Sequence, residues 1–124
     1  MQIWDVEYTD QFHQWYLTLG QEERDSVVAR VELLELAGPA LGRPVVDNVH
    51  RSRHANMKEL RAEKGIRVLF AFDPRRTAIL LIGGDKSPSE SGSPDWNRWY
   101  DRYLPVADDL YDIHLNELRG EGLL

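Results

Sequence analysis

Two kinds of apolar spacing divide the first 38 residues of the chain. Polar and apolar side chains alternate in IWDVEYT (3–9), which predicts a half-buried strand. Apolar side chains then recur at every third or fourth residue from Phe12 to Leu19, which predicts a helix that Gly20 ends. A second helix is expected in EERDSVVARVELLELAG (22–38), so the chain is predicted to begin with a strand and a helical hairpin.

The middle of the chain favours strands. Residues 38–56 contain two prolines, two glycines and no sustained period, which predicts an irregular loop with at most a short extended piece. Three strands are expected close together, at about 57–62, 66–73 and 77–83. Their turns are EKG, where Gly65 supplies a positive φ, and DPRR, where Pro74 takes the first turn position.

The last third of the chain returns to helical spacing. The Ser-, Pro- and Gly-rich stretch KSPSESGSPD (86–95) predicts a mobile loop. Apolar and aromatic side chains then follow at helical spacing from Trp96 to Leu118. Pro105 lies inside this pattern, and it either kinks one long helix or begins a second one.

Length and composition indicate one ordinary globular domain over residues 1–124. The absence of cysteine excludes disulfides and thiolate chemistry. The first residues have no basic segment followed by an apolar run, so we expect no signal peptide. The apolar stretches fall far short of the roughly 20 residues that a membrane-spanning helix needs, and we expect a cytoplasmic protein with no membrane contact.

Charge is distributed unevenly along the chain, whose formal net charge is -6. Residues 43–76 contain nine Lys or Arg and four Asp or Glu, a net charge of +5. The other 90 residues contain six basic and 17 acidic side chains, a net charge of -11. Phosphate binding is largely electrostatic, so residues 43–76 are the candidate surface for a polyanionic ligand.

This basic segment contains a pair of arginines that are predicted to face each other. A three-residue EKG loop places Arg61 opposite Arg67 on one face of a hairpin, with Leu60 opposite Val68 on the other. Like charges directly across a strand pair cost roughly 0.2–1 kcal/mol. One interpretation is that Glu59, diagonal to Arg67, neutralises the pair in a solvated charge ladder. The other is that both guanidinium groups converge on an anion such as phosphate.

A lysine follows the last predicted strand and bears on the second interpretation. Lys86 comes directly after LLIGGD, in which Gly83 and Gly84 are expected to turn the backbone sharply. Such a position can aim an ammonium group across the same sheet face as the arginines. The simpler alternative is an ordinary lysine in a turn.

Four segments together resemble the HigB-like branch of the RelE/ParE toxin superfamily: KELR, IRVLFAFD, LLIGGDK and WNRWYDRYLPVADDLYDIHL. The likeness covers about residues 57–118 at the level of motifs, and residues 1–56 agree only in the order of elements. The resemblance implies a small α+β RelE-like fold, in which an antiparallel sheet carries an N-terminal helical hairpin and one or more C-terminal helices.

The resemblance also implies a function. Most active members are toxins of type II toxin–antitoxin systems that cut messenger RNA in a ribosome-dependent way, without a metal or cofactor. The 2′-hydroxyl attacks the adjacent phosphate and leaves a 2′,3′-cyclic phosphate. Arg61 and Arg67 match the superfamily's arginines, and Lys86 matches its basic residue after the glycines. The implied partners are a helix-turn-helix HigA-like antitoxin, messenger RNA, the ribosome and, only through the antitoxin, operator DNA.

Weaker candidates for substrate contact are Lys58, Arg53, His54 and Tyr100. Strict alternation puts Lys58 on the face opposite Arg61 unless the hairpin is bulged. His54 and Arg53 belong to a basic loop, and His54 is also a candidate for acid–base chemistry. His50 and His54 have the spacing of a helical metal pair but lack a third ligand, so no metal site is expected. His114 lies on an apolar stripe and is interpreted as a packed histidine.

Two other functions remain open from the sequence. One is a ParE-like toxin that binds DNA gyrase and has no nuclease activity. The other is a catalytically inactive member that binds an antitoxin and represses transcription with it. A nuclease requires the basic trio to converge on one phosphate, whereas a gyrase-binding protein depends mainly on its protein-contacting surfaces.

Overall fold

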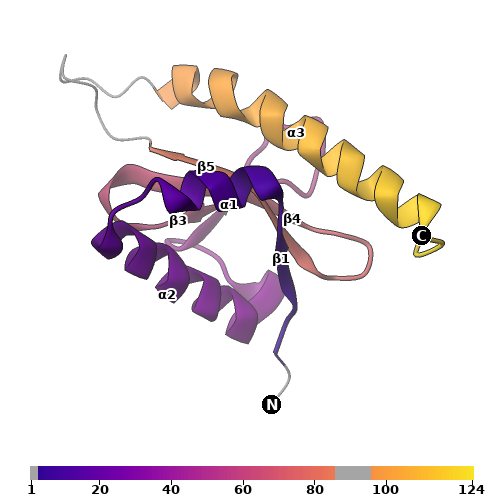
Figure 1. Ribbon diagram of the computed structural model, residues 1–124, viewed down its shortest axis with the longest axis horizontal. Helices are drawn as coiled ribbons and strands as arrows, with labels where there is room; N and C mark the ends of the chain where they lie inside the picture. Colours follow the sequence, from indigo (N-terminus) through magenta and orange to yellow (C-terminus); the bar gives the residue numbers. More distant parts are fainter. Residues whose placement is uncertain (1–2, 86–95) are drawn as a thin grey trace.

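The computed structural model describes residues 3–85 and 96–124, with the side chains of 96 and 97 left out. Its strands are β1 (Val6–Tyr8), β2 (Val46–Asn48), β3 (Lys58–Arg61), β4 (Ile66–Phe72) and β5 (Ala78–Asp85). Its α-helices are α1 (Asp10–Leu17), α2 (Gln21–Ala37) and α3 (Trp96–Gly120), and short 3₁₀ turns lie at Gly38–Ala40 and Glu63–Gly65. Figure 1 shows that α1 and α2 lie on one side of the sheet and α3 on the other.

The strands form one mixed sheet in the order β1-β5-β4-β3-β2. The pairs β2–β3, β3–β4 and β4–β5 are antiparallel, but β1 runs parallel to β5 at the edge. The prediction of an entirely antiparallel sheet is therefore wrong for this strand. The reason is the long connection: a chain that leaves β1 through two helices can return in either direction, whereas a short hairpin turn forces antiparallel pairing. The first strand is also shorter than the alternating pattern predicted.

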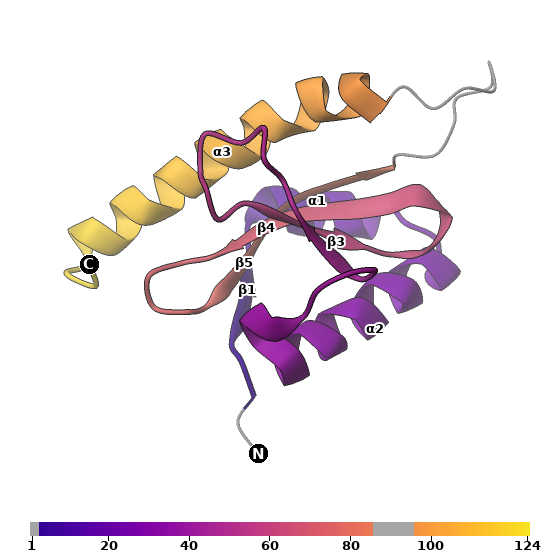
Figure 2. The same cartoon turned by 180° about the vertical axis from the view of Figure 1, so that it is seen from behind.

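Each face of the sheet has its own apolar core. On one face, Leu60, Val68 and Phe70 pack with Phe12 of α1 and Leu34 of α2. The opposite core unites the other face of β4 and β5 with α3, and its buried members are Val49, Met57, Leu69, Ala71, Ile79, Leu81, Trp99, Leu104, Ala107 and Tyr111. Figure 2, which views the molecule from behind, shows that α3 runs lengthwise along one side of the sheet. The α+β class, the helical hairpin and the C-terminal helix are confirmed.

Pro105 interrupts neither the pattern nor the helix. α3 is a single helix of 25 residues with this proline inside it. A proline removes one backbone hydrogen bond of the helix and is expected to bend it. The apolar stripe on both sides of Pro105 packs on the same sheet, so packing compensates for that loss.

Gly83 and Gly84 do not turn the backbone, contrary to the prediction. Both lie inside β5 with ordinary backbone angles, and a β-bulge at Leu69/Phe70 precedes their pairing with β4. Their function is close packing. A Cβ on Gly83 would lie 2.2 Å from the ring of Trp15 on one face, and a Cβ on Gly84 would lie 2.9 Å from the ring of Tyr103 on the other. The missing side chains therefore allow an aromatic ring to approach each face of the strand.

Candidate functional site

The hairpin between β3 and β4 holds the predicted arginine pair. Its register places Arg61 opposite Arg67 and Leu60 opposite Val68, as the three-residue loop predicts. The loop reverses the chain tightly because Lys64 and Gly65 both adopt positive φ, at 57° and 78°. A glycine adopts this conformation without strain, whereas a lysine there is less common.

The two arginines converge on a carboxylate of the protein itself. Glu59 Oε2 lies 3.0 Å from Arg61 Nε and 3.6 Å from Arg67 Nε. Only 1% of the Glu59 surface is exposed. The interpretation that Glu59 neutralises the pair is therefore correct about the contact, but the carboxylate is buried rather than solvated. A buried carboxylate of this kind is stable only when it is paired and hydrogen-bonded.

Arg61 and Arg67 differ in how far they reach the surface. The Arg61 side chain is 33% exposed and donates a second hydrogen bond, from Nη2 to Asp47 Oδ2 at 3.1 Å. The Arg67 side chain is 14% exposed and donates from Nη1 to the carbonyl of Ile66 at 2.9 Å. Burial lowers the pKa of Arg67, and the nearby Glu59 offsets this only in part. Arg61 is thus the outer and Arg67 the inner member of the pair.

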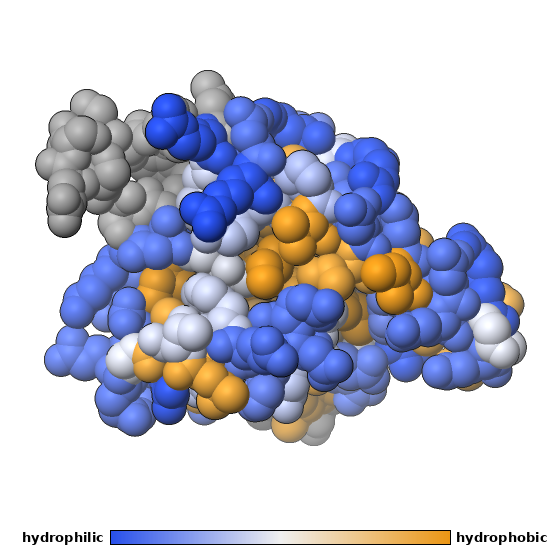
Figure 3. Space-filling model, turned by 45° about the horizontal axis from the view of Figure 1, so that its top comes forward, coloured by the Kyte–Doolittle hydropathy of each residue, from blue (hydrophilic) through white to orange (hydrophobic). Residues whose placement is uncertain are grey.

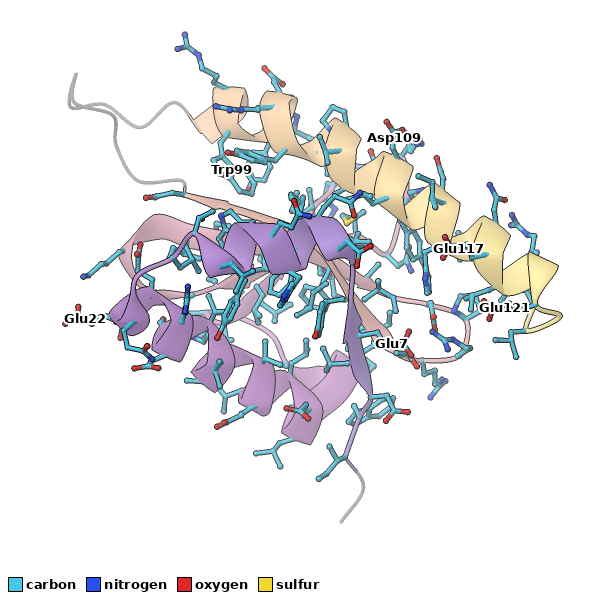
Figure 4. The ribbon with its side chains drawn as sticks, viewed as in Figure 1. Glu7, Glu22, Trp99, Asp109, Glu117 and Glu121 are labelled. Atoms are coloured by element: carbon cyan, nitrogen blue, oxygen red, sulfur yellow. The ribbon has the colours of Figure 1, made fainter. Side chains whose placement is uncertain are left out.

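The first turns of α3 cover this pair. The hydroxyl of Tyr100 donates a hydrogen bond to Glu59 Oε1. Burial raises the pKa of Tyr100, and the bond to Glu59 raises it further, so the hydroxyl keeps its proton. Trp99, which Figure 4 shows directed from α3 toward the sheet, packs beside Tyr100 with ring centroids 5.2 Å apart. Tyr100 is therefore part of the cluster, here as a partner of Glu59.

Of the other predicted residues, Lys58 lies on the opposite sheet face. There is no bulge within β3, so alternation holds, and Lys58 Nζ donates to Asn48 Oδ1 at 2.8 Å. Lys86 lies outside the described residues, as does the loop predicted at 86–95. Arg61 and Arg67 therefore converge as predicted. That Lys86 converges with them remains a prediction.

The basic loop that carries Arg53 and His54 does not join the arginine pair. Arg53 forms ion pairs with Asp109 and Asp112 of α3, and His54 Nε2 lies 2.8 Å from Asp112 Oδ1. Because Asp112 lies twelve residues beyond Tyr100 on α3, this contact is about 18 Å farther along the helix axis. The loop attaches to the acidic face of α3, where Figure 4 shows Asp109.

His114 is packed, as expected, but it also has a polar partner. Its Nε2 lies 2.8 Å from Oδ2 of Asp73, whose side chain is fully buried at the start of the β4–β5 turn. Asp73 also pairs with Arg75 at 2.8 Å, and Arg75 pairs with Glu7 of β1. Within the described part of the chain, no group of three or more His, Cys, Asp or Glu side chains is arranged to hold a metal ion.

Two hollows lie near these clusters. One of about 210 Å³ lies beside Tyr100 and is lined by Arg51, Tyr100, Asp101, Leu104, Pro105 and Asp108. Another of about 540 Å³ lies at the far end of α3, where Ile79, Leu110 and Ile113 meet Glu7, Glu117 and Glu121, and none of the predicted site residues lines it. Figure 3 shows apolar side chains bordered by hydrophilic ones on this side of the molecule, and Figure 4 shows the three glutamates.

The sequence did not predict that Asp47 belongs to the cluster, nor that α3 covers the arginine pair. Asp47 lies on the short strand β2, where it is paired with Glu59 across the ladder. It accepts one hydrogen bond from Arg61 and forms an ion pair with Arg43. The segment before β3 has no clear period, so its pairing with β3 could not be inferred. Tyr100 was selected as an aromatic side chain, but its bond to Glu59 spans 41 residues and has no local signal.

Comparison with known proteins agrees with the arrangement of these elements. Residues 14–112 match the model of the family "Phage derived protein Gp49-like (DUF891)". A protein of Mycobacterium tuberculosis named as a candidate toxin, HigB3, is 48% identical over 113 residues, which cover 90% of this chain and 94% of that protein. A second candidate toxin of that organism, HigB2, is 45% identical over 105 residues, which cover 82% of this chain but 49% of HigB2.

Solved structures support the fold alone. The RelBE2 toxin–antitoxin complex from Mycobacterium tuberculosis contains a chain with a TM-score of 0.55 and 18% sequence identity, and the match covers 71% of this chain and 97% of that one. The RelE–RelB complex from Pyrococcus horikoshii contains a chain with the same TM-score and 13% identity, matched over 71% of this chain and all of that one.

The fold and the sheet topology thus define a RelE-like α+β protein. The chain belongs to the Gp49-like family and is a relative of proteins named as HigB toxins, in line with the HigB-like branch of the RelE/ParE toxin superfamily that its sequence resembles. Among the helices that the structure describes, none combines the length and the apolar character that crossing a membrane requires.

Proposed function

We propose that this protein is a toxin that cleaves messenger RNA without a metal ion, in a ribosome-dependent way, and so inhibits translation. The observation that carries the proposal is the convergence of Arg61 and Arg67 on one carboxylate oxygen, at 3.0 and 3.6 Å. Guanidinium groups bind phosphate oxygens as they bind carboxylate oxygens, so a pair of arginines directed at one point is suited to a phosphodiester.

The proposed reaction is the one that the family resemblance implies. The ribose 2′-oxygen forms a bond to phosphorus while the bond from phosphorus to the 5′-oxygen breaks. The products are a 2′,3′-cyclic phosphate and a 5′-hydroxyl. The 2′-hydroxyl loses a proton and the leaving 5′-oxygen gains one. Negative charge grows on the phosphoryl oxygens during the step, so fixed arginines stabilise the transition state more than the ground state.

Roles for individual residues follow the same argument. Arg61, the more exposed arginine, makes the first contact with the scissile phosphate, and Arg67 stabilises the charge that develops on it. Lys86, which follows β5 in the chain, neutralises further charge or transfers a proton. The pKa of a lysine placed near two arginines would be lowered by their charge, which favours proton transfer near neutral pH.

The proposed protein partner is an antitoxin of the helix-turn-helix HigA-like type. Two solved RelE-like neighbours are complexes of a toxin with its antitoxin, which supports a partner of this kind for the present chain. In such a system operator DNA is contacted through the antitoxin. Messenger RNA on the ribosome is the proposed substrate.

The test is to map messenger RNA 5′ ends by sequencing soon after the chain is induced in growing cells. Wild type is expected to produce new 5′-hydroxyl ends inside translated frames, and Arg61→Ala and Arg67→Ala are expected to remove them. Arg119→Ala changes an exposed arginine in the last turn of α3 and serves as the matched control, with cleavage retained.

Other outcomes would replace the proposal. Growth arrest without new ends would indicate a gyrase-binding toxin of the ParE type, whose action does not require cleavage. Soluble protein that causes neither arrest nor new ends would indicate an inactive antitoxin-binding protein. New ends that persist in both arginine variants would locate the chemistry elsewhere in the chain.

A further inference from the structure

We infer that Glu59 is an internal anion that occupies the phosphate position of the arginine pair, and that the hydroxyl of Tyr100 holds it there. The inference concerns regulation of the site proposed above and rests on that site being an anion site. It predicts a closed form of the protein in which the substrate phosphate must displace a carboxylate.

Contact geometry is the first support. Both carboxylate oxygens of Glu59 are engaged: Oε2 faces the two arginine Nε groups, and Oε1 accepts the hydrogen bond from Tyr100. A carboxylate between two guanidinium groups is an anion that faces the same donors as a bound phosphate would. The residue is also more buried than either arginine, so its carboxylate is shielded from solvent.

The charge balance of the cluster is the second support. Arg43, Arg61 and Arg67 contribute three positive charges, and Asp47 and Glu59 contribute two negative charges through the ion pairs that join them. Asp85 also interacts electrostatically with Arg67, so the net charge of the cluster is about zero. This attracts a phosphodiester only weakly, because each carboxylate offsets most of one arginine. Removing the Glu59 charge would leave a stronger anion site at the same place.

The third support is that the residues in contact with Glu59 come from three different elements of the fold. Glu59 and Arg61 lie on β3 and Arg67 on β4, whereas Tyr100 lies on α3, which crosses over the sheet from the other end of the chain. Arg51 extends over the Tyr100 ring, with its guanidinium carbon 5.9 Å from the ring centroid, and forms an ion pair with the adjacent Asp101. These contacts fix the first turns of α3 in the position that holds Glu59 between the arginines.

The expected consequence is a reduced apparent affinity for phosphate. If only a fraction of molecules has Glu59 displaced, the apparent affinity equals the intrinsic affinity multiplied by that fraction. Changes that release Glu59 should therefore tighten binding, which is the opposite of what a substrate-binding role for Glu59 or Tyr100 would produce.

The test measures binding of a short, uncleavable 2′-O-methyl RNA by fluorescence anisotropy. Glu59→Gln keeps the size of the side chain and removes its charge, and should tighten binding about tenfold, the order expected for a like charge in contact with the ligand. Tyr100→Phe removes one hydrogen bond and should tighten binding about threefold. The double variant Glu59→Gln, Arg67→Ala should lose the gain.

Asp112→Asn is the matched control. It makes the same change in net charge on the same helix as Tyr100 but faces Arg53 and His54, so binding should change less than about twofold at moderate salt. Tyr100→Phe leaves the buried ion pairs intact and tests the inference even if Glu59→Gln destabilises the fold. Thermal unfolding of each variant establishes that binding is compared between folded proteins.

Unchanged or weaker binding in folded Glu59→Gln and Tyr100→Phe would overturn the inference, as would a gain that persists without Arg67. Binding and cleavage separate the two proposals. Tighter binding without any cleaved RNA would retain the internal anion and reject the nuclease. Cleaved RNA with unchanged binding in these variants would retain the nuclease and reject the internal anion.

Discussion

At the scale of single residues, one tight turn and one distant helix determine the geometry of Arg61, Arg67 and Glu59. The pairing of Arg61 with Arg67 was predictable, because a three-residue loop with Gly65 fixes which residues face each other. The contact between Glu59 and Arg67 was also predictable, since it is a diagonal neighbour on the same strand pair. The burial of Glu59 was not, because it depends on α3, which the chain reaches more than thirty residues later.

Asp73 is the residue for which the structure best defines how the stability of the protein depends on acidic pH. Burial raises its pKa, but hydrogen bonds from His114, Arg75 and the Thr77 N–H outweigh burial, so the pKa lies below its ordinary value of 3.8. The unfolded chain therefore binds this proton at a higher pH than the folded protein. The stability that Asp73 contributes is complete above about pH 3.8 and is lost as the pH falls through its folded pKa.

We predict that Asp73→Asn lowers the free energy of unfolding by about 2 kcal/mol at neutral pH, because buried donors lose a charged acceptor. The same variant should show a shallower loss of stability below about pH 4 than wild type. Urea unfolding over a pH series measures both effects. Asp112→Asn, at a half-exposed carboxylate on the same helix as His114, is the control and should lose less stability at neutral pH than Asp73→Asn. An equal acid slope in Asp73→Asn and wild type would contradict the prediction.

At the scale of elements, periodicity predicted the helical hairpin, the three antiparallel strands and the C-terminal helix. It did not predict that β1 joins the sheet in parallel, because the direction of a returning strand is decided by packing across a long connection. The sequence also left open whether Pro105 ends a helix. The shared apolar core on both sides of this proline accounts for the continuous α3.

The adjacent glycines of β5 could indicate either a turn or a close approach of another side chain. Glycine near a strand end usually indicates a turn, but here Gly83 makes room for Trp15, whose position 68 residues earlier gives no local signal. The close approach links α1 to the middle of the sheet, so this packing determines how the helical hairpin sits on β5.

We therefore predict that Gly83→Ala destabilises the protein by about 1–3 kcal/mol, the usual cost of overpacking a core. The added Cβ would lie 2.2 Å from the Trp15 ring, and the indole would have to move. Gly120→Ala is the matched control, because no atom lies within 4 Å of its added Cβ, and its stability should change by less than about 0.5 kcal/mol. Urea unfolding of both variants checks the prediction, and a neutral Gly83→Ala would contradict it.

At the scale of the whole molecule, the basic segment 43–76 does not form an open positive surface. Arg53, Lys64 and Arg75 form ion pairs with carboxylates of α3, α2 and β1, respectively. The acidic elements thus surround the basic middle of the chain and offset much of its charge. The sum of charges along the segment indicated where a polyanion could bind. It did not indicate which carboxylates would pair with these basic residues, because the paired residues are 42 to 68 positions apart.

This charge arrangement makes a prediction about how strongly salt affects RNA binding. The logarithm of the affinity for a single strand falls with the logarithm of salt concentration, with a slope of about -0.7 for each phosphate neutralised. Binding through the arginine pair alone engages one or two phosphates, so we expect a slope between about -0.7 and -1.4. Engagement of all nine basic residues of 43–76 would give a slope of about -6.

Fluorescence anisotropy with uncleavable 2′-O-methyl RNA over a series of potassium chloride concentrations measures this slope. Arg61→Ala should make the slope shallower, since it removes the more exposed member of the pair. Arg53→Ala should leave the slope unchanged, because that guanidinium is already held by Asp109 and Asp112. A steep slope that Arg53→Ala reduces would mean that the ion pairs with α3 open on binding, and that the whole basic segment contacts RNA.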